Sequence, residues 1–265
     1  MKKSVFKKYN LNEPKTWDEF LELNKKLKDN KITPIGIGTK NNWPAASWFS
    51  YLDLRINGLD FHRKLLTGEN SFKDEKVKKV LTTWKELIDK GYFIKKSEKY
   101  DWKGILPYMY RDKVGMYLIG NFALSRINIP LSKFGFFRFP IIDEKMPIYE
   151  EAPTDVLFIN KKSTKKESSK KFLEFMARPK SQYMLNEVLG FISPNNNAQD
   201  SNNEFVKVGA EILGQAEGVS QFFDRDTSQG MANEGFEIFG EFIRNPNIDK
   251  TMEALEKSRL KNLVK

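Results

Sequence analysis

Apolar residues recur at helical spacing along much of the chain. Between Asp74 and Lys90 they form one stripe, which predicts an amphipathic helix that ends at Gly91. The sequence Thr16-Trp17-Asp18-Glu19 is a capping box and predicts the start of a second helix, which continues to about Asn30. The members of the first stripe are Val77, Val80, Leu81, Trp84, Leu87 and Ile88.

Other stretches carry helix start and stop signals. Trp43-Pro44 predicts a helix that runs to Ile56 and ends at Asn57-Gly58, with Asn42 as its N-cap. Similar patterns predict helices over residues 100–111, 166–178, 180–189, 203–215, 228–243 and 248–262.

Short apolar runs predict the strands. The first 12 residues are interpreted as a strand remnant followed by a loop. Because the strands are too scattered for a regular series of βαβ units, the pattern predicts a helix-rich α/β fold. The predicted strands lie at 35–38, 114–119, 136–140 and 155–159.

The composition narrows the chemistry. The 265 residues are 40% apolar and 30% charged, which is typical of a globular chain, and no stretch approaches the roughly 20 apolar residues that span a bilayer. Cysteine is absent, and His62 is the single histidine, so thiolate catalysis, disulfides and multi-histidine metal sites are excluded. No GxSxG pattern accompanies His62, which is therefore expected to be structural. We expect no metal, no cofactor and no catalytic residue.

The net charge of +10 raises the question of whether the protein binds nucleic acid. Lysine supplies 36 of the 45 basic residues, whereas arginine, the better bidentate phosphate ligand, supplies 9. The densest basic stretch, 161–171, holds six lysines and no aromatic residue on which a base could stack. A solvated face is favoured over a nucleic-acid surface.

Two loops resemble ligand motifs but lack essential positions. Gly36-Ile37-Gly38 would need a third glycine where Asn41 stands, so a nucleotide loop is not supported. Asp224-Arg225-Asp226 resembles the start of a calcium loop, but Gln229 and Gly235 replace its glycine and its bidentate glutamate. Two interpretations remain for this segment. Either Thr227 or Ser228 caps the next helix, or Arg225 and Asp226 bind hydroxyl groups of a ligand.

The tryptophans separate into two groups. Trp17 and Trp84 lie on apolar stripes and are expected in the core, while Trp102 fits either group. Trp43 begins its helix in a polar loop, where an aromatic ring can serve as a platform for the C–H face of a sugar. The alternative is that Trp43 is a hydrophobic staple for its own helix.

Five segments, in their order along the chain, resemble the family 1 extracellular solute-binding proteins of ABC transporters, especially the sugar binders. Together they extend over nearly the whole sequence. The segments are Glu13–Phe20, Trp43–Phe61, Gly115–Phe122, Phe139–Asp143 and Lys170–Met176.

The resemblance implies a periplasmic binding protein type II-like fold, in which two lobes close on a ligand like a hinged clamp. Members of the family begin with a signal peptide and an N-terminal lobe. Here Lys7-Lys8 interrupts any apolar signal core, and the chain opens near the first crossover between the lobes. We therefore expect a C-terminal lobe plus fragments of the N-terminal lobe. In this division 1–40 is the N-terminal remnant with the crossover, 41–265 is mainly the helix-rich ligand-binding lobe, and about 114–160 contains crossover strands shared with the other lobe.

The resemblance also implies the site. Trp43, beside Asn42, falls where relatives place an aromatic residue against the sugar, and Phe122, after Asn121, falls where others carry a stacking aromatic. The remaining residues that it assigns are Asp155, near a crossover, and Phe223, Arg225 and Asp226, in a late segment of the cleft.

The function that follows is the substrate-binding component of an ABC importer. It would bind a mono- or oligosaccharide by aromatic stacking and hydroxyl hydrogen bonds. It would work as a monomer in the periplasm or outside the cell and deliver the sugar to permease subunits, without catalysis or nucleic-acid binding. The alternatives are a carbohydrate-active enzyme with two carboxylates, a basic nucleic-acid-binding protein and a non-functional truncated remnant.

Overall fold

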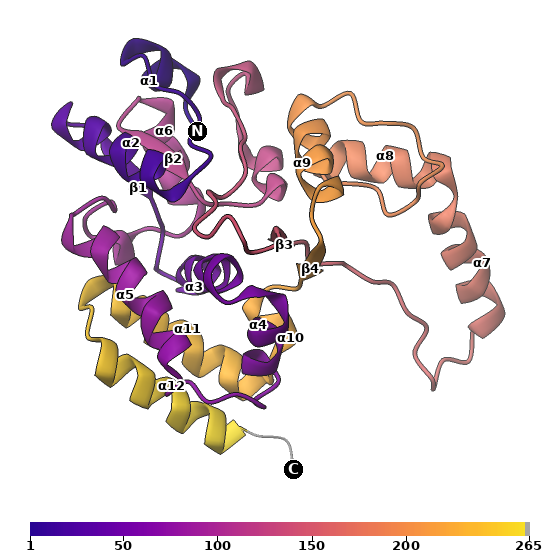
Figure 1. Ribbon diagram of the computed structural model, residues 1–265. Coiled ribbons are helices and arrows are strands. Elements are labelled where there is room, and N and C mark those ends of the chain that lie inside the picture. Colours follow the sequence, from indigo (N-terminus) through magenta and orange to yellow (C-terminus); the bar gives the residue numbers. More distant parts are fainter. Residues whose placement is uncertain (263–265) are drawn as a thin grey trace.

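Helix α3 (Trp43–Ile56) lies in the middle of the main body of the protein (Figure 1). The computed structural model describes residues 1–262. Eleven side chains of α3 are buried, on all sides of the helix, as expected for a helix enclosed by others. It packs against α4 (Gly58–Leu66), α5 (Glu75–Asp89) and α11 (Gln229–Arg244). The predicted bounds of α3 are thereby confirmed, and Gly58 adopts the expected positive φ of 81°.

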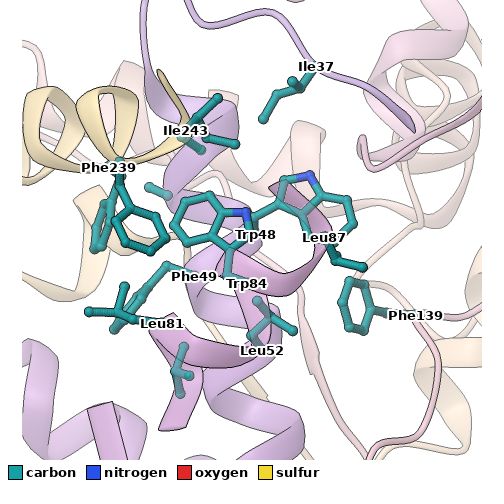
Figure 2. Packing of buried hydrophobic residues seen from close by; sticks show 14 of the residues in the cluster. Ile37, Trp48, Phe49, Leu52, Leu81, Trp84, Leu87, Phe139, Phe239 and Ile243 are labelled. Carbon is teal, nitrogen blue, oxygen red and sulfur yellow. The ribbon is translucent and has the colours of Figure 1, made fainter. Parts of the chain in front are cut away.

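The predicted stripe of α5 is confirmed as the centre of the core (Figure 2). Trp84 is fully buried, with its ring centroid 6.2 Å from that of Phe239 and 5.1 Å from that of Phe242 on α11. Helix α12 (Ile248–Asn262) covers α11 and α5 from outside. His62 of α4 is also fully buried, with its Nδ1 2.8 Å from Asp53 Oδ2, which confirms a structural role for this residue.

A small parallel sheet lies beside this core. Helix α2 (Trp17–Asp29) begins at the predicted capping box, where the Glu19 amide donates to Thr16 Oγ1 over 3.3 Å and the Thr16 amide donates to the Glu19 carboxylate over 3.2 Å. It packs on β1 (Thr33–Gly36), which pairs with β2 (Val114–Tyr117). Both strands were predicted, but β1 lies two residues earlier than the predicted 35–38, and β2 ends two residues before the predicted end at 119.

The first 12 residues are not the predicted strand remnant. They form helix α1 (Lys3–Lys8), because Val5 and Phe6 find apolar partners in the core. Only the residue before the helix retains a strand-like contact, an isolated antiparallel bridge between Lys2 and Phe134.

The predicted helix at 100–111 is wrong for most of its length. The segment contains the 3-10 turn Lys103–Ile105 and the short helix α6 (Leu106–Tyr110), and another 3-10 turn, Ser97–Lys99, precedes it. Gly104 and Pro107 explain the interruption, because glycine weakens a helix interior and proline is accepted only in a first turn.

Three helices form an arm that extends from the main body (Figure 1). They are α7 (Lys166–Ala177), α8 (Pro179–Leu189) and α9 (Glu204–Gly214), all close to their predicted bounds. The chain enters the arm after β3 (Tyr149–Glu151) and returns through β4 (Gly218–Ser220), which pairs with β3 in parallel. No residue of α7 is buried.

The two later strand predictions are wrong. Residues 136–140 have irregular backbone, flanked by the isolated bridges of Phe134 with Lys2 and of Ile141 with Thr16. Residues 155–159 are also irregular, and the side chain of Phe158 is 80% exposed. In the described part of the chain no backbone group of 155–159 forms a hydrogen bond. An apolar run becomes a strand only where a neighbour supplies ladder partners, and here none lies alongside.

We expect Trp84→Ala to lower the free energy of unfolding by about 3–5 kcal/mol, because it opens a cavity among rings that cannot collapse into it. Chemical denaturation followed by circular dichroism measures the loss. Leu260→Ala is the matched control, since Leu260 is exposed and its truncation should change stability by less than about 0.5 kcal/mol. Equal effects of the two substitutions would contradict the assignment of Trp84 to the core.

Candidate ligand-binding site

A cavity of about 210 Å³ lies between the first turn of α3, the 3-10 segment η3 (Asn121–Arg126), the short helix α10 (Phe223–Asp226) and α11. Its walls combine aromatic rings with a hydroxyl, a carboxylate and a guanidinium group. The lining residues are Trp43, Ala46, Ser47, Phe122, Phe222, Phe223, Asp224, Arg225 and Phe236.

Trp43 is the first residue of α3, and its side chain lines the cavity while half buried. The residue one turn later on the same face is Ser47, which also lines the cavity. Trp43 is at N1, after the N-cap Asn42, and not at the N′ position that a hydrophobic staple occupies, so the geometry favours the platform interpretation.

Asn42 enters α3 with a left-handed backbone, φ 56°, a conformation that asparagine tolerates better than most residues. Its side chain does not form the predicted cap of α3. The amide oxygen instead accepts a hydrogen bond of 3.4 Å from Arg244 of α11. A Cβ atom at Gly240 would collide with the same amide, so that Asn42 fits only against a glycine of α11. The ligand role of Asn42 stays a prediction.

Phe122 also lines the cavity, next to Trp43. The centroids of the two rings are 6.1 Å apart, with an interplanar angle of 53°. The ring of Phe122 folds back over Gly120, where an added Cβ would lie 2.5 Å from the ring. The glycine before the segment is therefore what lets this aromatic take its position. The neighbouring Asn121 side chain approaches Gly209 of α9, with its amide nitrogen 4.0 Å from where a Cβ would stand.

The three predicted site residues of α10, Phe223, Arg225 and Asp226, have different surroundings. Phe223 is mostly a core residue, only 2% exposed, with its ring edge-on to Phe239 at 5.2 Å. The Arg225 guanidinium lies 2.9 Å from the carboxylate of Asp155 and donates a hydrogen bond of 3.2 Å to the carbonyl oxygen of Thr154. The structure thus joins two predicted site residues that are 70 positions apart in an ion pair at the cavity.

Asp226 has a local partner, because its carboxylate accepts a hydrogen bond of 3.1 Å from the Gln221 amide. The prediction that Ser228 caps the next helix is confirmed, since its hydroxyl accepts a 3.3 Å hydrogen bond from the Met231 amide. The structure therefore gathers Trp43, Phe122, Phe223 and Arg225 around the cavity, with Asp155 held through Arg225.

Sequence reasoning missed the polar members Ser47 and Asp224 and the aromatic residue Phe222. Ser47 could have been found from its helical spacing to Trp43. Phe222 and Asp224 flank a predicted site residue, but nothing in their spacing shows which way each points.

A buried carboxylate lies close to the site, on β3. Burial raises the pKa of the Glu151 carboxyl well above its usual value, and the negative charges of Asp224, Glu150 and Asp226 add to this shift. Its Oε1 atom is shielded from solvent and has no hydrogen-bond partner among residues 1–262. The folded environment therefore disfavours ionisation of Glu151, although the nearby Ser50 hydroxyl lowers its pKa and acts in the opposite direction.

The helix-rich α/β fold is that of a solute-binding protein. The family model described as bacterial extracellular solute-binding protein matches residues 2–183, and the chain belongs to this family. Among the helices described, none is both long and apolar enough to cross a membrane.

The solved structures similar to this chain have the same fold. The bacterial solute receptor AcbH is 28% identical, with a TM-score of 0.92 over 99% of this chain and 69% of that one, and is described as having an exclusive preference for β-D-galactopyranose. A chitin oligosaccharide binding protein, 17% identical, matches with a TM-score of 0.83 over 99% of this chain and 68% of that one. The second likeness shows the fold alone.

Curated relatives agree with the family. The multiple sugar-binding protein of Streptococcus mutans is 26% identical over 200 residues, which cover 71% of this chain and 46% of that protein. An ABC transporter extracellular-binding protein of Pyrococcus horikoshii is 27% identical over 202 residues, which cover 74% of this chain and 44% of that protein. The chain thus spans about half the length of the curated relatives that it matches.

We expect Glu151→Gln to stabilise the protein at pH 7. The folded state holds the Glu151 proton to a higher pH than the unfolded state, whose glutamate pKa is about 4.3, so stability falls as the pH rises from there toward the raised folded pKa. Glutamine carries no such proton, so the gain should be largest near neutral pH and shrink toward pH 4. Melting temperatures between pH 4 and pH 8 measure it, with the exposed Glu237→Gln as control. A Glu151→Gln protein that is less stable at pH 7 than at pH 4, relative to the unmutated chain, would show that Glu151 is ionised.

Proposed function

We propose that this chain binds a neutral saccharide in the Trp43–Phe122 cavity as the substrate-binding part of an ABC importer. The observation that carries the proposal is the cavity itself, in which half-buried aromatic rings face a serine hydroxyl and a charged rim. Sugars require this combination, because a pyranose presents apolar C–H faces and a circumference of hydroxyl groups.

The energy of binding would come from several modest contacts. A ring face against Trp43 or Phe122 contributes about 0.5–1.5 kcal/mol beyond buried area, by analogy with aromatic pairs. Ser47 can donate to or accept from a hydroxyl, and Asp224 can accept from one. The cavity of about 210 Å³ lies below the range of roughly 300–1,000 Å³ for most ligand pockets, which suits a single sugar ring.

The charges favour a neutral ligand. Among residues 1–262, Arg225 is the one basic side chain in the cavity wall, and Asp155 neutralises it over 2.9 Å. An acidic sugar would have to compete with that carboxylate and would also meet Asp224 on the rim. A neutral hydroxyl group can accept a hydrogen bond from Arg225 while the ion pair with Asp155 stays intact, and it is not repelled by Asp224.

The carboxyl groups at the cavity are suited to binding a sugar without hydrolysing it. Hydrolysis of a glycoside uses two carboxyl groups that flank the bond, one of them free to donate a proton. At this cavity Asp155 is engaged by Arg225 and Asp226 by a backbone amide. Asp224 lines the cavity and can accept a hydrogen bond from a sugar hydroxyl. As in the family, the protein would act as a monomer in the periplasm or outside the cell and pass the sugar to permease subunits.

Calorimetry against a saccharide panel tests the proposed function. Galactose, mannobiose, raffinose and stachyose are suitable ligands, with amino acids and short peptides as controls. Because the cavity covers one face of a sugar, we expect millimolar affinity, about −4 kcal/mol, for at least one saccharide. Binding of amino acids or peptides alone would refute the proposal.

Trp43→Ala should weaken saccharide binding by tenfold or more, which corresponds to about 1.4 kcal/mol, with a smaller loss of stability than Trp84→Ala. The reason is that Trp43 lies outside the main core while Trp84 lies at its centre. Trp43→Phe keeps an aromatic face and should retain most of the affinity. Should Trp43→Ala unfold as early as Trp84→Ala while its folded fraction binds normally, Trp43 is a structural residue.

A further inference from the structure

Three buried polar atoms without partners lie where α3 meets β3 and β4. They are Oε1 of Glu151, Oγ of Ser50 and Oγ of Ser220, and none of them has a hydrogen-bond partner among residues 1–262. Ser50 is fully buried, and Ser220 is only 2% exposed. Because roughly 90% of buried polar groups in proteins have a partner, three unpaired atoms in one region require an explanation.

The pairing of the two strands brings these atoms together. Glu151 and Ser220 are direct partners in the parallel ladder, and residues opposite each other on neighbouring strands have side chains on the same face of the sheet. Ser50 belongs to α3, which packs against β3, and its hydroxyl is close enough to the Glu151 carboxyl to influence its pKa. One carboxyl and two hydroxyl groups therefore share a small interior region, the polar cluster Ser50–Glu151–Ser220.

This polar cluster borders the wall of the ligand cavity. Ser50 is one helical turn after Ala46 and Ser47, which both line the cavity. From β4 the chain passes through two residues into α10. Asp224 of α10 lines the cavity and also lies close enough for its charge to act on the Glu151 carboxyl. The protonation state of Glu151 therefore bears on the position of α10.

The nearby positive charges are already engaged. Arg55 of α3 and Arg138 contact the Glu150 carboxylate at 2.7 Å and 3.2 Å. Arg225 of α10 is paired with a carboxylate on the other side of the cavity wall, 2.9 Å away. In the part of the chain that the structure describes, Glu151 itself has no ion pair. An ionised Glu151 would be a buried charge without a partner, which is unfavourable.

The other titratable groups around Glu151 do not compensate a negative charge. Asp224 and Asp226 face it from α10 and oppose its ionisation. Tyr51 of α3 stays neutral, because burial and the neighbouring carboxylates raise the pKa of its hydroxyl well above the usual value. Arg63 of α4 donates over 2.8 Å to a backbone carbonyl oxygen of β4.

We propose that Glu151 is a positioning residue that makes saccharide binding depend on a proton. The inference rests on the proposed function. With its proton, Glu151 is neutral and can donate a hydrogen bond to a neighbouring serine, and α10 stays against α3 as part of the cavity wall. Without the proton, its charge repels Asp224 and Asp226 and displaces α10, so the saccharide loses the contacts that this helix supplies.

The saccharide and the proton then bind cooperatively. The saccharide makes its full set of contacts only with the protonated form. Its affinity is therefore highest at acid pH and falls as the pH rises through the folded-state pKa of Glu151, which lies above that of a free glutamate. By linkage, saccharide binding favours the protonated form by the same free energy and raises this pKa further.

Calorimetric titrations with galactose, mannobiose, raffinose and stachyose between pH 5 and pH 9 test the inference. For the saccharide that binds most tightly, we expect the Kd to rise by about tenfold across one transition, which corresponds to a shift of one pKa unit between the free and the bound protein. In the range of the transition, titrations in buffers of different ionisation enthalpy should show that the protein takes up protons when it binds.

Glu151→Gln keeps a neutral side chain of similar shape at every pH, and its Kd should not depend on pH. The exposed Glu237→Gln is the matched control and should retain the transition. Asp226→Asn removes one of the charges that oppose ionisation of Glu151, so it should move the transition to lower pH. A purely structural role of Glu151 would produce neither the flat profile nor this shift. Melting curves establish that each variant is folded.

The contrary outcomes separate the inference from the proposed function. A Kd that stays constant from pH 5 to pH 9, or a transition that persists in Glu151→Gln, overturns the inference and leaves the proposed function intact. A folded Glu151→Gln protein that binds no saccharide also overturns it, because the neutral form is then not the binding form. Absence of binding by every saccharide at every pH refutes the proposed function and this inference with it.

Discussion

A buried arginine connects the site-bearing helix to the strands that cross the protein. Arg55, near the end of α3, lies 2.7 Å from the Glu150 carboxylate on β3 and donates to the carbonyl oxygens of Phe139 and Tyr149. Removing one partner of such a buried pair costs about 3–5 kcal/mol, because the other charge is left without compensation. The cavity depends on this connection. Trp43 and Ser47 lie at the other end of α3, and Phe222 follows β4, which pairs with β3.

The local physics of the sequence is enough to predict most helices. The stripe of α5 and the capping box of α2 are short-range patterns, and both elements appear where they were predicted. The strands depend on distant partners and were predicted less well. The run at 155–159 has the apolar character of a buried strand but no neighbour to pair with, whereas β3 contains two glutamates and forms because β4 lies beside it. The proposed boundary at residue 40 remains a prediction.

The features of the candidate site also divide into those that the sequence could predict and those that depend on the folded structure. Trp43 was singled out because a large aromatic residue in a polar loop has no place on a stripe, and Phe122 because of the family resemblance. The sequence could not show that the Asn42 side chain has a partner inside the protein, since its contact with Arg244 is set by the tertiary fold. Nor could it show that Asp226 turns back to the Gln221 backbone amide within its own short segment. It also left Trp102 undecided, because the contact with Phe122 joins two loops that are 20 residues apart.

The central claim is that a saccharide binds in the Trp43–Phe122 cavity and not elsewhere on the protein. The five tryptophan indole N–H signals in a ¹H–¹⁵N spectrum test it directly, once each is assigned by a Trp→Phe substitution. On titration with a saccharide that binds, the account predicts a shift for Trp43, while the core residues Trp17, Trp48 and Trp84 keep their positions. Binding heat without any shift at Trp43, or shifts confined to the core tryptophans, would contradict it.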